Sequence, residues 1–257
     1  MDRRAWLAER RAATIAEYDA EAATFEQHEY PAEAQRWFVA WLLETFPPGG
    51  IVLDAPCGTG KYFPLVEAAG RRVAGIDQSA GMLAEARAKG IAVSLEQVGL
   101  QELAFDRDFD AVMTIDAMEN VSPEDWPLVL ANLHRAVQPG GHLYLTVEEG
   151  HEGVVDAAFA SLVERGLPAV RGEVIERGAA GYHYYPSRER ILDWIAAEGL
   201  EVVAEEHDQV GAAWGYRHFL LRAPGGTARA TRSLGIAASW TPDTARLAGE
   251  VRPEPRT

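Results

Sequence analysis

The sequence predicts an α/β protein whose seven-stranded, mostly parallel sheet is covered by helices on both faces. Two observations support this fold class. Short apolar segments alternate with helical segments between residues 51 and 150, which is typical of parallel sheets. Two later apolar segments, 200–206 and 214–222, are joined by a short link, which favours an antiparallel hairpin at one edge of the sheet.

Each predicted strand is a short apolar segment bounded by turn residues. The seven segments span 51–55, 72–77, 91–97, 109–116, 142–149, 200–206 and 214–222. Glycine and proline clusters separate several of them, such as "PPGG" before the first and "PGG" before the fifth. Because the first five alternate with helices, we expect their carboxyl ends to lie along one edge of the sheet.

The predicted helices carry recognisable start and stop signals. Ser79 is expected to cap a helix over 79–90, and Ser122 a helix over 122–137. Residues 5–46 are also helical in pattern, with a second helix beginning at Pro31. Further helices are predicted over 61–70, 154–165 and 187–199.

Composition argues against a nucleic-acid partner and a membrane protein. The net charge is −15, so no basic face for phosphates is expected. No apolar segment approaches the roughly 20 residues that span a bilayer, and the chain starts with charged residues rather than a signal peptide. The single cysteine, Cys57, permits neither an intramolecular disulfide nor a cysteine-based zinc site. We therefore predict a cytoplasmic protein with a small-molecule substrate and no metal.

The segment "DAPCGTGKYF" at 54–63 follows the first strand and precedes a helix. Glycines there let a ligand approach the backbone, at the edge where such folds bind cofactors. Phe63 occupies the place of the third glycine of G-x-G-x-x-G, which weakens a dinucleotide interpretation. Lys61 is followed by Tyr62 rather than Ser or Thr, which argues against a phosphate-binding P-loop.

Asp77 ends the second strand, about 20 residues after the glycines. A carboxylate at this place suits the two hydroxyls of a ribose. An aspartate that ends a strand is also a common helix cap. The glycine turn and Asp77 together favour the ribose role.

Here the sequence resembles a known family, the S-adenosylmethionine-dependent methyltransferases with a Rossmann-like fold. The resemblance covers roughly residues 15–222 and is carried by several segments rather than one. These are "VLDAPCGTGKY", "VAGIDQSAGMLAEAR", "FDAVMTIDAMENV", "LHRAVQPGGHLYLTVEE", "YYPSRERILDWIAAEGLEVV" and "YRHFLLR". The resemblance implies a class I fold, S-adenosylmethionine as cofactor and a small-molecule methyl acceptor.

The resemblance also implies which residues hold the cofactor. Asp54 is expected near the methionine ammonium, and the carbonyl of Asp116 or of Ile115 is expected to face the same amine. Asp77 is expected to take the ribose hydroxyls, with Gln78 near the adenine. The remaining implied cofactor residues are Tyr18 on an N-terminal lid helix, the backbone of Ala55, Gly58 and Gly60, and Gly99 with Leu100 beside the adenine.

The candidates for catalysis lie in two segments. Glu119 and Asn120 occupy the loop where the family often reads Glu-His, and Asn120 cannot act as a base, so Glu119 is the candidate for proton removal or for holding an acceptor cation. His183 and Tyr184 belong to "GYHYYP", a segment that the family places over the acceptor. Aromatic faces bind apolar or cationic acceptors, and His183 is expected to titrate near neutral pH. A loop carboxylate facing solvent and an aromatic segment that only packs remain the alternatives.

Three other functions remain open at this stage. The same fold and cofactor also suit intramolecular cyclisation of the aminobutyrate arm of the cofactor, because the family's usual histidine is Asn120 here. A pocket filled by tyrosines would favour a non-catalytic cofactor-binding scaffold. An NAD-dependent oxidoreductase is a more distant alternative, since Phe63 and the later segments count against it.

The resemblance implies a division of the chain. We expect an N-terminal helical lid over 1–46, a cofactor-binding domain over 47–222 with an acceptor-pocket insert at about 150–186, and a flexible tail over 223–257. In the tail, Pro, Gly, Ala and Arg dominate, with a short helix expected near 241–248. The sequence leaves a monomer and a homodimer equally open.

Overall fold

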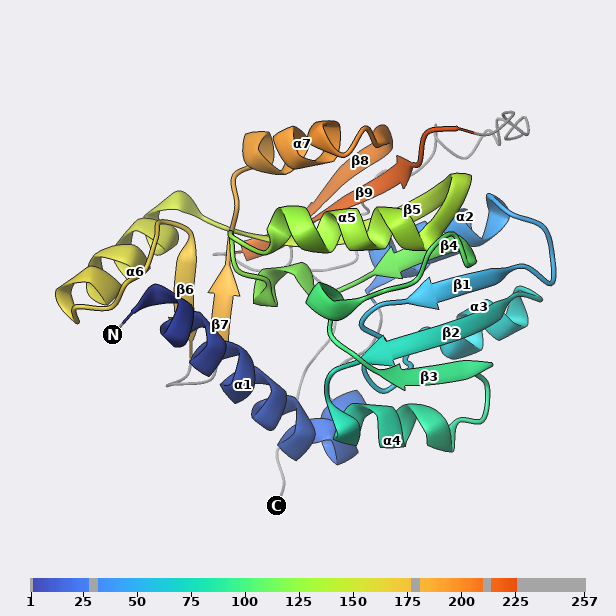
Figure 1. Ribbon diagram of the computed structural model, residues 1–257, viewed down its shortest axis with the longest axis horizontal. Coiled ribbons are helices and arrows are strands. Elements are labelled where there is room, and N and C mark those ends of the chain that lie inside the picture. Colours follow the sequence, from blue (N-terminus) through green and yellow to red (C-terminus); the bar gives the residue numbers. More distant parts are fainter. Residues whose placement is uncertain (1, 28–31, 177–180, 210–213, 226–257) are drawn as a thin grey trace, which may run out of the picture. The chain divides into compact units, whose positions relative to one another are not determined.

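The computed structural model describes residues 2–27, 32–176, 181–209 and 214–225 (Figure 1). Its main sheet has seven strands in the order β3-β2-β1-β4-β5-β9-β8. The neighbours among β1 to β5 are parallel, while β9 is antiparallel to both β5 and β8, so the predicted fold class is confirmed. The strands are β1 Ile51–Asp54, β2 Arg72–Asp77, β3 Ser94–Gln97, β4 Phe109–Thr114, β5 Val137–Gly150, β8 Glu201–Gln209 and β9 Trp214–Arg222.

Helices connect the strands and cover the sheet. The α-helices are α1 Arg3–Glu21, α2 Glu33–Glu44, α3 Phe63–Ala68, α4 Ala80–Ala88, α5 Trp126–Ala136, α6 Glu152–Glu164 and α7 Arg188–Ala197. Three 3₁₀ turns also occur: η1 Ala22–Gln27, η2 Leu100–Glu102 and η3 Met118–Asn120. As predicted, the Ser79 side chain caps α4 by accepting a hydrogen bond from the Met82 N–H.

Strand alternation divides the apolar side chains between two cores, one on each face of the sheet. In β4, Val112 lies in the core that includes α5 and α7, whereas Ala111 and Met113 lie in the core that includes α2 and α3. Figure 1 shows α5 crossing in front of the sheet and α2 behind it. Both faces are therefore covered, and ligand access is left to the ends of the strands.

Two predicted helix starts need correction. The helix expected from Ser122 begins at Trp126 as α5, because the Ser122 carbonyl accepts the N–H groups of Asp125 and Trp126 in a preceding turn. The helix expected from Pro31 begins at Glu33, after Ala32, and Pro31 lies outside the described residues. In both places the sequence has a proline before the helix, which the pattern places at the first helical position. Pro31 precedes the first residue of α2 by two positions, and Pro123 precedes that of α5 by three.

Several predicted strand limits also differ from the observed ones. The fifth strand begins at Val137 rather than 142, because Val137 pairs with Phe109 before an irregularity in the register. The third begins at Ser94 rather than 91, and β8 continues to Gln209. The helix expected near 241–248 and most of the expected tail lie outside the described residues.

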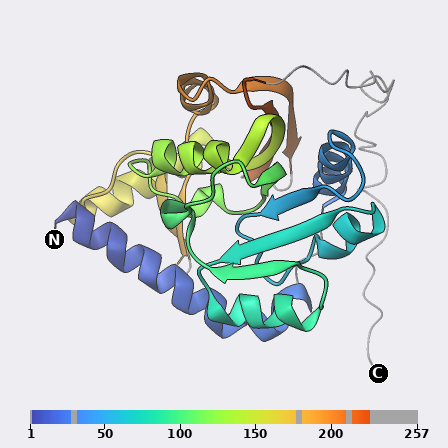
Figure 2. The ribbon, with the colours of Figure 1, turned by 45° about the vertical axis from the view of Figure 1, so that its right-hand side comes forward.

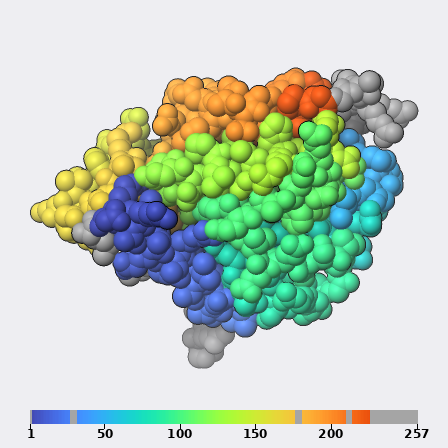
Figure 3. Space-filling view, viewed as in Figure 1, coloured from blue at the N-terminus to red at the C-terminus, as the bar shows by residue number. Residues whose placement is uncertain are grey.

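The glycine-rich segment after α6 forms a separate two-stranded sheet. Its strands, β6 Glu173–Glu176 and β7 Gly181–Tyr184, are antiparallel. Helix α1 contacts both β7 and α4, and Figures 2 and 3 show it lying between the α6–β7 segment and the part of the surface that holds α4. Helix α1 thus forms an outer wall beside the strand ends. In the described part of the chain, no helix is long and apolar enough to cross a membrane.

Candidate active site

A cavity lies at the carboxyl ends of β1, β2 and β4, where the sequence predicted the cofactor. Its empty volume is about 960 Å³, which includes open solvent at its mouth. This size suits a ligand as large as a nucleoside derivative. Its lining includes eight of the predicted site residues: Tyr18, Gly58, Asp77, Gln78, Gly99, Leu100, Asp116 and Asn120.

The two glycines of "CGTG" have different physical roles. Gly58 has φ +52°, and a Cβ built there would meet no atom within 4 Å, because the residue borders open space. Gly60 has φ +78°, and a Cβ there would lie 2.5 Å from the Phe63 ring. Gly58 thus borders the ligand cavity, while Gly60 lets Phe63 pack closely on the turn. Gly60 is not part of the cavity lining.

The Asp77 carboxylate is held in place by backbone N–H groups from the loop after β1 and the turn after β2. One carboxylate oxygen accepts the Gly58 N–H at 2.9 Å, and the other accepts the Ser79 N–H at 2.8 Å. Burial raises the pKa of Asp77 despite these hydrogen bonds. The Gln78 backbone also donates to this carboxylate. Since a carboxylate has about four acceptor positions, the side chain keeps room for a further hydrogen bond from a ligand.

Asp54 and Ala55 lie beneath the cavity rather than in its wall. Asp54 is 1% exposed, and its Oδ2 has no hydrogen-bond partner. Burial raises the pKa of Asp54 well above its usual value. The Ala55 N–H donates to the Met113 carbonyl, which fixes the start of the loop after β1. Neither side chain lines the cavity.

Asp116, after β4, is the centre of a polar network that the sequence did not reveal. Its φ is +51°, and its N–H donates to Thr146 Oγ1 at 2.8 Å. Its carboxylate accepts hydrogen bonds from Gln35 Nε2 at 2.6 Å and Lys61 Nζ at 2.9 Å. Lys61 was considered above only as evidence against a P-loop. Both partners come from segments far from Asp116 in sequence, so no local pattern marked them.

Helix α1 forms one wall of the cavity. Tyr18 is half-buried, and its hydroxyl oxygen accepts a hydrogen bond from the Asn120 side chain, which lowers its pKa. Desolvation and next the charge of Glu119 outweigh this effect and raise the pKa of Tyr18. About two turns earlier in the same helix, Arg11 donates to Gln78 Oε1 at 3.1 Å and to the Glu102 carboxylate at 2.7 and 2.5 Å. Arg11 also lies beside Gly99. These contacts fasten α1 across the side of the cavity where the sequence predicted the adenine.

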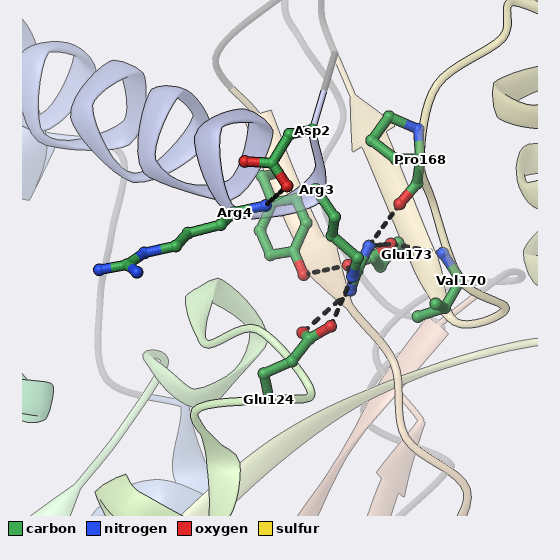
Figure 4. Close-up of polar contacts among 8 residues, drawn as sticks. Asp2, Arg3, Arg4, Glu124, Pro168, Val170 and Glu173 are labelled. Carbon is green, nitrogen blue, oxygen red and sulfur yellow. Dashed lines mark hydrogen bonds and ion pairs between the residues drawn. The ribbon is translucent and has the colours of Figure 1, made fainter.

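Figure 4 shows how the N-terminal end of α1 is held. The Arg3 guanidinium donates to Glu173 at 2.8 and 3.0 Å, to Glu124 at 2.5 and 2.9 Å and to the Pro168 carbonyl at 2.6 Å. Glu173 is fully buried and also accepts the Tyr182 hydroxyl at 2.8 Å and the Val170 N–H at 2.7 Å. This network joins α1 to β6, β7 and the turn before α5.

Beside the cavity, titratable side chains from three separate elements lie within electrostatic reach of one another. Glu119 of η3 is 4% exposed, and its Oε2 has no hydrogen-bond partner. Burial and then the charge of Glu148 on β5 raise the pKa of Glu119 to about 8, while His183 on β7 opposes the shift. His183 Nδ1 lies 3.2 Å from a Glu148 oxygen and 2.9 Å from the Tyr185 hydroxyl. The predicted candidates Glu119 and His183 are thus brought together, next to Asn120.

Tyr184 is not part of this group. In β7, residues alternate between two faces, so Tyr184 points the opposite way from His183. Its ring lies in the core that contains Tyr182 and Trp194. Tyr184 thus packs in the apolar core, whereas His183 lies beside Glu148.

The comparisons with known proteins agree with this geometry. The family model described as "Methyltransferase domain" matches residues 52–141. The chain is 31% identical over 193 residues to "Ubiquinone/menaquinone biosynthesis C-methyltransferase UbiE" of Brucella abortus (strain S19), which covers 68% of this chain and 71% of that one. It is 35% identical over 154 residues to the malonyl-[acyl-carrier protein] O-methyltransferase of Erwinia pyrifoliae, with 58% of this chain and 57% of that one covered.

A solved structure shows a similar fold. It is the 1,6-didemethyltoxoflavin-N1-methyltransferase of Burkholderia thailandensis, with bound 1,6-didemethyltoxoflavin and S-adenosylhomocysteine. The TM-score is 0.65 at 16% sequence identity, over 87% of this chain and 91% of that one. With the identity to the quinone-pathway enzyme and the matching domain model, this chain belongs to the S-adenosylmethionine-dependent methyltransferases with a Rossmann-like fold and uses S-adenosylmethionine as its cofactor.

Proposed function

We propose that this methyltransferase acts on a small-molecule acceptor bound between α1, η3 and the β6–β7 segment. The observation that carries the proposal is that Glu119, next to the cavity-lining Asn120 in sequence, lies within electrostatic reach of Glu148 and His183. The relatives named above methylate carbon, oxygen and nitrogen atoms according to their names, so they support a small acceptor without fixing its reacting atom.

The cavity suits the cofactor residue by residue. The Asp77 carboxylate is fixed by backbone donors and keeps acceptor capacity for a ribose hydroxyl. Open space beside Gly58 leaves room for a ligand against the backbone. We assign Gln78, Gly99 and Leu100 to the adenine end, and Asp116, with Tyr18 nearby, to the methionine end. Asp54, with its buried unpartnered oxygen, and Ala55 and Gly60 would support the site from beneath.

When bound, S-adenosylmethionine supplies an electrophilic methyl group and leaves as S-adenosylhomocysteine. The protein's part is then to align the acceptor and exclude water. If the acceptor atom carries a proton, a side chain must also take it. Glu119 and His183 are the candidates for that role, and Asn120 is assigned to holding Tyr18 in place.

The proposal also includes the division of the chain expected from the sequence. We propose that residues 1–46 include the lid, that the insert at about 150–186 covers the acceptor and that residues 223–257 form a tail. Within the first segment, α2 packs against the sheet, so the lid role falls to α1. A cytoplasmic location, the absence of nucleic-acid and membrane partners, and a monomer or homodimer remain predictions.

Calorimetry tests the proposed function. We expect micromolar binding of S-adenosylmethionine and S-adenosylhomocysteine but not of NAD. Asp77→Asn should abolish it, because the amide offers one acceptor oxygen instead of two. Asp106→Asn, at an exposed position, is the matched control. Binding would justify a mass-shift screen of acceptor libraries, together with a test for conversion of the cofactor alone. If neither sulfur compound binds, the proposed function is wrong.

A further inference from the structure

The polar group beside the cavity has an excess of negative charge. The carboxyl of Glu119 faces Glu148 from β5 and His183 from β7, the two strands that pack against η3. Asp116 and the Tyr18 hydroxyl lie nearby, and the charge of Asp116 is already paired with Lys61. His183 is therefore the basic side chain of this group that remains to balance the two glutamates.

The two glutamates are buried, so their negative charge carries an energetic cost that a ligand can relieve. The Glu119 Oε2 is buried and unpartnered, while Glu148 is 7% exposed and contacts His183. A buried carboxylate without a partner is costly, because the protein interior screens its charge poorly. Nearby carboxylates relieve this cost by retaining a proton or by binding a cation. A cationic ligand is thus the kind of molecule that these side chains favour.

The same residues lie close to where the acceptor must be. Asn120, next to Glu119 in sequence, lines the cofactor cavity, and so does Tyr18, whose hydroxyl feels the charge of Glu119. Asp116 also lines the cavity and lies within electrostatic reach of Glu119. Glu119 therefore lies within electrostatic reach of both the cavity wall and the Glu148–His183 pair.

From this arrangement we propose that Glu119, Glu148 and His183 form the acceptor subsite, and that it selects an acceptor with a basic nitrogen. The inference rests on the proposed function and adds a substrate class to it. The ammonium form of the acceptor binds between the two glutamates, and one of its protons passes to the Glu148–His183 pair. The nitrogen lone pair exposed in this way forms the new bond to the methyl carbon, while the electrons of the broken carbon–sulfur bond stay on sulfur.

A cofactor analogue tests the subsite without knowledge of the acceptor. Sinefungin carries an amine where S-adenosylmethionine carries its methyl group, whereas S-adenosylhomocysteine has no charge there. We expect the wild-type protein to bind sinefungin more tightly than S-adenosylhomocysteine by about tenfold, the effect of one hydrogen bond to a charged group. Calorimetry with both ligands gives this ratio directly.

Variants identify the residues responsible. Glu119→Gln and Glu148→Gln should each lower the ratio toward one and leave the affinity for S-adenosylhomocysteine unchanged. Glu85→Gln, an exposed glutamate on α4, is the control and should keep the ratio. If the ratio is the same in all four proteins, the inference is overturned. If S-adenosylhomocysteine itself does not bind the wild-type protein, the proposed function fails instead.

The pH dependence gives a test that needs no variant. Glu119 loses its proton near pH 8 in the folded protein, so its attraction for an ammonium grows as the pH rises toward that value. The wild-type ratio of the two affinities should therefore increase between pH 6.5 and 8.5, by about threefold or more. A ratio that stays flat or falls over this range contradicts a role for Glu119 in binding the cation.

Discussion

Arg3 and Glu173 are joined by two hydrogen bonds of 2.8 and 3.0 Å, although 170 positions separate them in the sequence. The Glu173 carboxylate is completely buried, and Arg3 is the cation that neutralises it. Arg3 also binds Glu124, so one side chain links α1 to two other parts of the fold. The N-terminal end of α1 is therefore held by this guanidinium, while Arg11 holds the helix further along.

Arg3→Met should loosen α1, because it leaves Glu173 buried without its cation. We expect a loss of about 3 kcal/mol in the free energy of unfolding, or an equivalent loss of protection in α1 alone. Urea unfolding and amide hydrogen exchange distinguish these outcomes. Arg4→Met is the matched control, since Figure 4 shows the Arg4 side chain pointing away from the network. Equal protection of α1 in both variants would contradict this role for Arg3.

Tyr18→Phe removes the hydrogen bond between the Tyr18 hydroxyl and Asn120. The affinity for S-adenosylhomocysteine should fall about fivefold, as expected for one neutral hydrogen bond that orders the cavity wall. Calorimetry measures this change. Tyr184→Phe should leave the affinity unchanged, because its ring lies in the apolar core. A larger effect from Tyr184 than from Tyr18 would show that the acceptor side was assigned to the wrong face of β7.

Glu119 should make the folded protein less stable as the pH rises. Its pKa is about 8 in the folded protein, against an ordinary value of 4.5. Between these values the folded state keeps a proton that the unfolded state has lost, so stability falls with increasing pH. Glu119→Gln should remove this contribution, and its stability relative to the wild type should increase from pH 5 to pH 8. Urea unfolding at intervals across that range checks this, and parallel curves would contradict it.

Two glycine substitutions should change stability in opposite directions. A Cβ at Gly75 in β2 would lie 2.7 Å from Cys57 Sγ and 2.8 Å from Leu95 Cδ2, so Gly75→Ala should cost about 1–3 kcal/mol. A Cβ at Gly153 in α6 would meet nothing within 4 Å, so Gly153→Ala should add about 0.5–1 kcal/mol. Thermal unfolding measures both. If Gly75→Ala is neutral, the packing of Cys57 against β2 is looser than the structure indicates.

The sequence predicted the sheet well because its signals are local. Alternation of apolar and helical segments, the Ser79 cap and the short link between the last strands each depend on a few neighbouring residues. The helix start at Ser122 was wrong because a serine followed by a proline also suits the turn that uses the Ser122 carbonyl. The strand start at Val137 was wrong because it depends on a pairing with the distant Phe109. Local patterns do not record such pairings.

The sequence likewise predicted only part of the candidate site, namely the residues that directly follow strands. Gly58, Asp77 and Gln78 follow strands directly, so their place at the cavity could be read from the sequence. Lys61 and Gln35 meet Asp116 only through the fold, and neither had a distinguishing sequence pattern. The separation of His183 from Tyr184 required the alternation of β7, which the sequence did not assign as a strand.

The position of α1 also has a consequence for how the active site is made. Helix α1 precedes every other described element in the chain, yet its anchor Glu173 lies on β6. During synthesis, α1 has left the ribosome long before β6 exists, although its contacts with Gln78 and Glu102 are available earlier. The wall that α1 forms can therefore be fully anchored only after β6 has been made. A nascent chain that stops short of β6 would lack a complete site, even with the glycine turn and Asp77 already in place.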